Sequence, residues 1–237
     1  MYVLITLIQT VIFAPKKVAR PSKLARYAAN AVSDNVIDPS KEVYGVIKGR
    51  WNELFFKNDQ PITVELACGR GEYTIGLAAA FPGRNYIGVD LKGDRVFVGS
   101  QQAQAKGLTN VAFVRSRIEL LPTLFAPGEI NEIWLTFPDP RPKDRDEKHR
   151  LVNAKYLTIY QSVLHSDGWF RFKTDNTQLF DYGLECLKVF AIKNLEFTHD
   201  LYHSPLLAEH HGLKTKYEKI WTEKGETIKY LKFQFEK

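Results

Sequence analysis

From about residue 61 onward, short apolar runs alternate with stretches in which apolar residues recur three and four positions apart. The apolar runs are flanked by residues typical of turns and predict strands. The stretches between them predict helices. The predicted strands span residues 62–66, 85–90, 111–114, 130–137 and 169–173, followed by 197–201 and 228–235, which alternate like strands at a sheet edge. The predicted helices span residues 73–80, 94–106, 153–164 and 179–190.

This repeated order of strand and helix predicts an α/β fold with a mostly parallel sheet and helices on both of its faces. Ligands bind such sheets beyond the carboxyl ends of the strands. Segments that follow strands are therefore expected to meet at one rim, and they are residues 65–71, 90, 116–118, 136–143 and 174–176.

Residues 1–60 are expected to form an N-terminal extension and basic arm, ahead of a domain at residues 61–237. Residues 22–31 predict a short basic helix, and Trp51, Leu54, Phe55 and Phe56 form an apolar cluster expected to dock the extension on the domain. Residues 2–14 are apolar but too few to span a bilayer, which takes ~20 residues. We expect them to pack on the domain or to have no function. A weak membrane anchor is the alternative.

The chain carries a formal net charge of +6, which suits an anionic partner such as nucleic acid but also serves solubility. The distribution of charge is more informative, because residues 1–33 hold five basic residues and no acid, and the tail from Lys214 holds seven lysines. Two cysteines build neither a disulfide framework nor a four-cysteine zinc site, so a reducing, cytoplasmic compartment is expected. No metal is expected, and His210 and His211 are interpreted as a surface pair.

The loop after the first strand of the domain reads Glu65-Leu66-Ala67-Cys68-Gly69-Arg70-Gly71. Its small residues allow a tight turn close to a ligand. Glu72 at the following helix start disfavours a pyrophosphate, which needs that helix terminus for itself. A ligand with an amino group and a sulfonium, such as S-adenosylmethionine, suits Glu65 and Glu72 better. Asp90 ends the next strand, where a carboxylate is placed to accept ribose hydroxyls. A chance glycine turn with a capping Asp90 is the competing interpretation.

A second loop, Phe137-Pro138-Asp139-Pro140, places one carboxylate between two prolines. Proline fixes its own φ and restricts the residue before it, so the loop is expected to present Asp139 rigidly. A basic run follows directly and predicts a phosphate-contacting surface, with a merely solvated charged face as the alternative; it comprises Arg141, Lys143, Arg145, Lys148 and Arg150.

Together these motifs resemble the bacterial tRNA (guanine-N7)-methyltransferase family, a class I S-adenosylmethionine-dependent group with a Rossmann-like fold. The resemblance runs from about residue 49 to Glu218. It rests most specifically on the segment from Phe137 to Lys143 together with Phe172-Lys173-Thr174-Asp175-Asn176, and also on the glycine loop, on Tyr86-Ile87-Gly88-Val89-Asp90 and on Thr215-Lys216-Tyr217-Glu218.

The resemblance implies transfer of a methyl group from S-adenosylmethionine to N7 of guanine 46 in tRNA, by a monomer or weak homodimer. It implies Asp139 as the catalytic acid. The implied cofactor contacts are Glu65, Gly69, Asp90, Arg117, Ile118 and Asp139. The implied substrate contacts are Lys143, Asp175, Thr215, Lys216, Tyr217 and Glu218.

Three positions depart from the family pattern. Ala67 replaces a glycine, and its methyl group is expected to fit unless φ is positive. Arg117 replaces an acid near the adenine, which leaves the backbone at Arg117 and Ile118 to contact the base. Arg141 replaces a tryptophan and is able to stack on a base or contact phosphate. These departures keep two alternatives open: a class I methyltransferase for another RNA or a small molecule, and a tRNA-binding module without activity.

Overall fold

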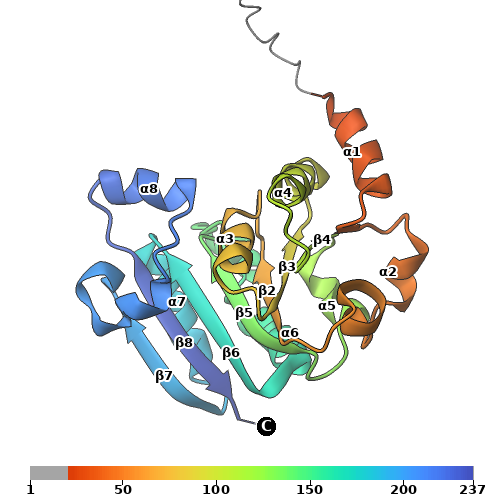
Figure 1. The fold of residues 1–237 in the computed structure, drawn as a ribbon. Coiled ribbons are helices and arrows are strands. Elements are labelled where there is room, and N and C mark those ends of the chain that lie inside the picture. The colour runs from red at the N-terminus through yellow and green to blue at the C-terminus, as the bar shows by residue number, and fades with distance from the viewer. Residues whose placement is uncertain (1–20, 237) are drawn as a thin grey trace, which may run out of the picture.

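The computed structural model describes residues 21–236, and within them one eight-stranded sheet carries helices on both faces (Figure 1). The strand order is β1-β4-β3-β2-β5-β6-β8-β7. All pairs from β1 to β6 are parallel, and β8 runs antiparallel to β6 and β7. The strands are β1 (Val36–Ile37), β2 (Ile62–Leu66), β3 (Asn85–Asp90), β4 (Val111–Arg115), β5 (Ile130–Thr136), β6 (Leu164–Thr174), β7 (Ile192–Thr198) and β8 (Lys229–Phe235).

The α/β prediction is therefore confirmed, and each predicted helix is present within about one turn of its expected bounds. Side-chain caps define two helix starts, since Asn153 accepts a hydrogen bond from the amide of Lys155 and Asn176 accepts one from Leu179. The helices are α1 (Lys23–Val32), α2 (Glu42–Val46), α3 (Glu72–Ala80), α4 (Gly93–Ala105), α5 (Leu121–Leu124), α6 (Ala154–Val163), α7 (Thr177–Leu187) and α8 (Lys216–Glu223).

The segment before residue 61 is built into this core. β1 pairs with β4 at one end of the sheet. Trp51 is fully buried, donates from Nε1 to the carbonyl of Leu124 at 2.9 Å, and stacks on Phe125 with ring centroids 5.2 Å apart. The predicted basic helix is α1, and Asn30 joins it to α4 through the carbonyl of Gly93. Residues 1–20, with the apolar run and part of the basic arm, lie outside the described residues.

Two strand predictions near the C-terminus were wrong. The strand expected at residues 197–201 ends at Thr198, and a short 3₁₀ turn begins at Leu201. β8 is not an edge strand, because it lies between β6 and β7 with all seven residues buried. The polar residues of β8 suggested a solvent-exposed face, but they are buried with partners in the protein. Lys232 Nζ, for example, lies 2.7 Å from Glu209. Among residues 21–236, no helix has the length and apolar character of a membrane span.

The carboxyl ends of the parallel strands form one edge of the sheet, and α8 lies above the end of β6 and the start of β8 at this edge (Figure 1). The loops that follow β2, β3, β4 and β5 start there as well. The fold thus brings the predicted ligand-binding segments to one side of the molecule.

Candidate active site

The loop after β2 turns through two residues in the left-handed region next to Cys68, with φ of 53° at Ala67 and 59° at Gly69. The Ala67 methyl group was expected to fit only if φ was not positive, and φ is positive. This conformation costs about 1–2 kcal/mol relative to glycine. A hydrogen bond fixes the loop to the end of β3, because the Gly69 amide donates to the Asp90 carboxylate at 2.9 Å. A Cβ at Gly69 would meet nothing within 4 Å, so this backbone faces open space.

Glu65 lies at the bottom of the site and is almost fully buried. Its Oε1 accepts the Thr136 hydroxyl at 2.6 Å, and its Oε2 accepts both the amide and the hydroxyl of Thr74. Burial raises the pKa of Glu65 above its usual value, although these hydrogen bonds oppose the rise. Oε1 keeps one free acceptor position for a ligand.

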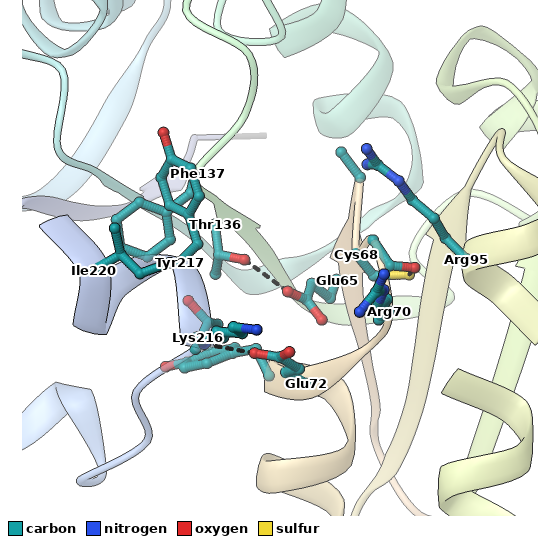
Figure 2. Close-up of a pocket in the computed structure, with 14 residues that line it drawn as sticks. Glu65, Cys68, Arg70, Glu72, Arg95, Thr136, Phe137, Lys216, Tyr217 and Ile220 are labelled. Carbon is teal, nitrogen blue, oxygen red and sulfur yellow. Dashed lines mark hydrogen bonds between the residues drawn. The ribbon is translucent and has the colours of Figure 1, made fainter. Parts of the chain in front are cut away.

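Two hollows open at this edge and share Ala67, Arg95 and Phe137 in their walls. The first, here called the Glu65 hollow, has a volume of about 390 Å³. Figure 2 shows it between the Glu65 loop and α8, with Glu72, Arg70, Lys216 and Tyr217 around it. The second, here called the Asp90 hollow, has a volume of about 480 Å³. The shared walls make the two hollows neighbouring parts of one cleft.

The Asp90 hollow collects the predicted contacts that follow β3 and β4. Asp90 lies in its wall with Arg117 and Ile118. The two Asp90 oxygens accept the amides of Gly69 and Lys92, which leaves one further acceptor position on each. The Arg117 side chain is two-thirds exposed and lies 3.9 Å from Glu119.

The loop after β5 borders both hollows. Phe137 has a φ of 48°, and its amide donates to the Lys173 carbonyl at 2.8 Å. A phenylalanine in the left-handed region is a strained position, of the kind that clusters at functional sites. Asp139 projects from the loop with its side chain 64% exposed and lies 3.2 Å from Arg141 Nε. The proline-bounded loop therefore presents its acid at the rim of the Asp90 hollow, beside a cation.

The basic run after this loop forms an exposed surface. Arg141, Lys143 and Arg145 are exposed, as the phosphate-contact interpretation requires. Lys143 begins the 3₁₀ segment Asp144–His149 and lies outside both hollows. Arg150 differs, because its guanidinium packs over the Tyr182 ring at 4.5 Å and donates to the carbonyl of Arg141.

The four residues predicted at the late substrate loop open α8 and have different environments. The Thr215 side chain caps the helix by accepting from the Glu218 amide. The Lys216 amide donates to Glu72, and the Tyr217 ring packs on Phe137 with centroids 5.4 Å apart (Figure 2). Thr215, Lys216 and Tyr217 line the Glu65 hollow. Glu218 does not, because it is fully buried behind them.

Asp175 is separated from the other predicted substrate contacts. It lines a third hollow of about 330 Å³ with Trp221 and Glu226, and its carbonyl accepts from Lys229. Burial raises the pKa of its carboxyl above the usual value. The structure thus brings Glu65, Asp90 and Asp139 to one cleft and leaves Asp175 at a neighbouring site behind α8.

The sequence interpretation missed several residues of the cleft. Arg95 lines both hollows, and Tyr156 reaches the Asp90 hollow from α6, where its hydroxyl donates to Glu119 at 2.9 Å. Neither carries a local motif. The interpretation of His210 as a surface residue was wrong, since it is 3% exposed and bonded to Glu218. The signal for it was weak: a histidine pair beside lysines resembles a solvated segment.

The charged side chains around the cleft fit a ligand that carries both positive and negative groups. Glu65, Glu72 and Asp90 suit an ammonium, a sulfonium and ribose hydroxyls, and Arg70 and Arg95 suit a carboxylate. S-adenosylmethionine combines these groups. No group of three or more His, Cys, Asp or Glu side chains in residues 21–236 is arranged to hold a metal ion.

Comparison with known proteins identifies the family of the chain. Residues 59–231 match the family model described as "Putative methyltransferase". The chain is 49% identical over 215 residues to the tRNA (guanine-N(7)-)-methyltransferase of Cytophaga hutchinsonii, covering 90% of this chain and 97% of that one. The chain belongs to the tRNA (guanine-N7)-methyltransferase family. A second member, from Christiangramia forsetii, is 44% identical with the same coverage.

Solved structures extend the likeness in fold beyond this family. The crystal structure of the 16S rRNA methyltransferase KamB superimposes with a TM-score of 0.56 at 15% identity, over 75% of this chain and 89% of that one. An antibiotic-related methyltransferase superimposes with a TM-score of 0.54 at 18% identity, over 77% and 90%. At such identities the likeness supports the Rossmann-like class I methyltransferase fold of this family member, and only the fold.

Proposed function

We propose that this protein transfers a methyl group from S-adenosylmethionine to N7 of a guanine in tRNA, with guanine 46 of the variable loop as the target. The observation that carries the proposal is the cleft itself, in which Glu65, Asp90 and Asp139 lie along the carboxyl edge of the sheet, next to an exposed basic surface. The names of the relatives specify the base and the atom.

Guanine N7 carries an in-plane lone pair at neutral pH, so the protein need not remove a proton from it. S-adenosylmethionine, when bound, would supply an electrophilic methyl group, whose bond to the sulfonium breaks to leave S-adenosylhomocysteine. The task of the protein is then to hold the base in line, and good positioning is worth ~7–11 kcal/mol of the barrier. Methylation leaves the guanine ring positively charged. Asp139 either stabilises that charge or accepts a hydrogen bond from the base and orients it.

The residues proposed to hold the cofactor line the two hollows. Asp90 keeps acceptor positions for ribose hydroxyls, and the backbone at Arg117 and Ile118 is proposed to contact the adenine. Glu65 and the open backbone at Gly69 are proposed to receive the amino-acid portion. These assignments follow the chemistry of the side chains that face each hollow.

The RNA is proposed to bind across the basic rim. Lys143 and its exposed neighbours suit phosphates, whose contacts fix register and make binding salt-dependent. Tyr217 is proposed to contact the base from the cleft, and Asp175 is proposed to contact the tRNA from its separate hollow. The side chains proposed for catalysis and RNA contact all lie in residues 61–237. Residues 1–60 are proposed as an extension whose basic arm contacts RNA, while its later part, with β1 and Trp51, packs into the core of the domain. A tRNA substrate and the free cysteines suit a cytoplasmic location.

The variant Asp139→Ala tests the proposal. We expect it to fold and to bind S-adenosylmethionine in calorimetry, but to lose most 7-methylguanosine formation, measured by mass spectrometry of tRNA nucleosides. Asp181→Ala is the matched control, because Asp181 is similarly exposed on α7 and pairs with His199 outside the cleft. Near-normal product from Asp139→Ala would refute the catalytic role.

The two alternatives predict different outcomes for the wild-type protein. A methyltransferase for another substrate binds the cofactor but leaves no 7-methylguanosine in tRNA. A tRNA-binding module without activity shows no heat of binding with S-adenosylmethionine.

A further inference from the structure

A buried cluster of polar side chains lies directly behind the Glu65 hollow. At its centre, Lys173 Nζ lies 2.9 Å from Glu218 Oε2, and both side chains are 0% exposed. The other carboxylate oxygen, Oε1, accepts the Tyr202 hydroxyl at 2.8 Å and lies 2.9 Å from His210 Nε2. Every hydrogen-bonding direction that the structure gives Glu218 leads into the protein, and none leads into a hollow.

Glu218 also attaches α8 to the rest of the molecule. Among the described residues of α8, Glu218 is the buried one, while Tyr217 and Ile220 remain about two-fifths exposed. An isolated helix of this length is unstable in water. Because Glu218 is the buried residue of α8, the buried contacts that hold this helix are the bonds that its carboxylate makes.

Lys173 connects this helix to the floor of the hollow. Its Nζ lies 4.5 Å from the centroid of the Tyr73 ring on α3 and 5.5 Å from that of Phe137. Its carbonyl accepts the amide of Phe137, the residue in the strained conformation. One buried lysine thus contacts the floor of the hollow and the helix that covers it.

The first turn of α8 forms that cover. The Lys216 amide donates to Glu72 at 2.6 Å, and Tyr217 packs against Phe137 (Figure 2). Both contacts come from the two residues that precede Glu218. Loss of the Glu218 bonds would therefore release two sides of the hollow together.

We infer that Lys173 and Glu218 are positioning residues that, with His210 and Tyr202, latch α8 over the Glu65 hollow. Glu218 then acts through α8 and not by contact with the guanine, which differs from the role that the family resemblance implied. The inference deepens the proposed function, because it rests on the hollow receiving part of the cofactor.

The ionisation state of Glu218 agrees with a latch. Burial by itself raises the pKa of this carboxyl, but the hydrogen bonds and charges of His210 and Lys173 bring it below its usual value. The carboxylate is therefore charged at neutral pH. Breaking a buried pair by removing one partner is strongly destabilising, since the other charge stays buried.

Hydrogen exchange of the α8 amides, followed by mass spectrometry without any ligand, tests the latch directly. We expect Glu218→Gln and Lys173→Met each to raise this exchange roughly 100-fold. Tyr202→Phe removes one of the three partners of the Glu218 carboxylate and keeps both charges, so it is expected to raise exchange by a smaller factor while folding normally. Glu129→Gln is the matched control, because its carboxylate accepts the amides of Gly49, Trp51 and Ala126 outside the cleft.

A second readout is the affinity for S-adenosylhomocysteine in calorimetry, without tRNA. We expect roughly tenfold weaker binding for Glu218→Gln and for Lys173→Met, and no greater loss in the double variant, because the two residues act as one unit. Unchanged α8 exchange and unchanged affinity, with a defect only in the KM for tRNA, would overturn the latch and restore a base contact. Failure of the wild type to bind S-adenosylhomocysteine would instead refute the proposed function, while the exchange result still decides the latch.

Discussion

The hydrogen bond between Thr136 and Glu65 allows a quantitative test of how the cleft floor is held. Thr136→Val replaces a hydroxyl by a methyl group of similar size in a buried position. The variant therefore removes the 2.6 Å bond to Oε1 without opening a cavity. The bonds that Thr74 makes to Oε2 remain.

The expected cost follows from the charge of the acceptor. A hydrogen bond to a charged group contributes about 1.5–3 kcal/mol, so we expect a loss of about 2 kcal/mol in the free energy of unfolding. For a chain of this size that loss lowers Tm by about 4–8 °C. Thr158→Val is the control, because this hydroxyl donates to the Ala154 carbonyl at an exposed position of α6, and it is expected to change stability by less than about 0.5 kcal/mol.

The effect also depends on pH. Burial raises the folded-state pKa of Glu65, so this residue favours folding most below its unfolded pKa and less as pH rises through the folded value. Without the Thr136 hydroxyl the folded pKa rises further, and the stability difference from wild type should grow between about pH 5 and pH 8. Urea unfolding at both pH values measures it. A loss equal to that of Thr158→Val, or a difference that shrinks with pH, would refute the reasoning.

Three further changes have defined outcomes. Gly71→Ala should destabilise the protein by about 2–5 kcal/mol in urea unfolding, because φ is 68° and the new Cβ would lie 2.4 Å from Phe113; a change below about 1 kcal/mol would contradict this. Ala67→Gly should change stability by less than about 1 kcal/mol, since relief of strain offsets chain entropy, and a loss above about 2 kcal/mol would show that the methyl group packs tightly. Lys143→Ala should lower the slope of log Kd for tRNA against log salt by about 0.7–0.9, and an unchanged slope would exclude a phosphate contact.

Much of the fold was predictable because the central strands are continuous apolar runs with helices between them. The strand at Asn85–Asp90 was predicted at its observed bounds. Prediction failed where polar side chains are buried. Lys229 and Lys232 made β8 look like an edge strand, although both side chains are buried with partners: Lys229 donates to the carbonyl of Asp175, and Lys232 pairs with Glu209.

The candidate site divides in the same way. The acids that follow strands, Glu65 and Asp90, were predictable because a parallel sheet collects its strand ends at one edge. The burial of Glu218 was not predictable, because it depends on Lys173 lying 45 positions away on another element. The positive φ of Ala67 was stated only as a condition, because the residue here is alanine and not the glycine that would indicate such a conformation.

The central claim is methyl transfer to one guanine of tRNA. The most direct measurement compares two tRNA transcripts, one with guanine at position 46 and one with adenine there, each incubated with the wild-type protein and S-adenosylmethionine. Nucleoside mass spectrometry should find 7-methylguanosine in the first transcript and none in the second. Equal amounts in both transcripts, or none in either, would contradict the account.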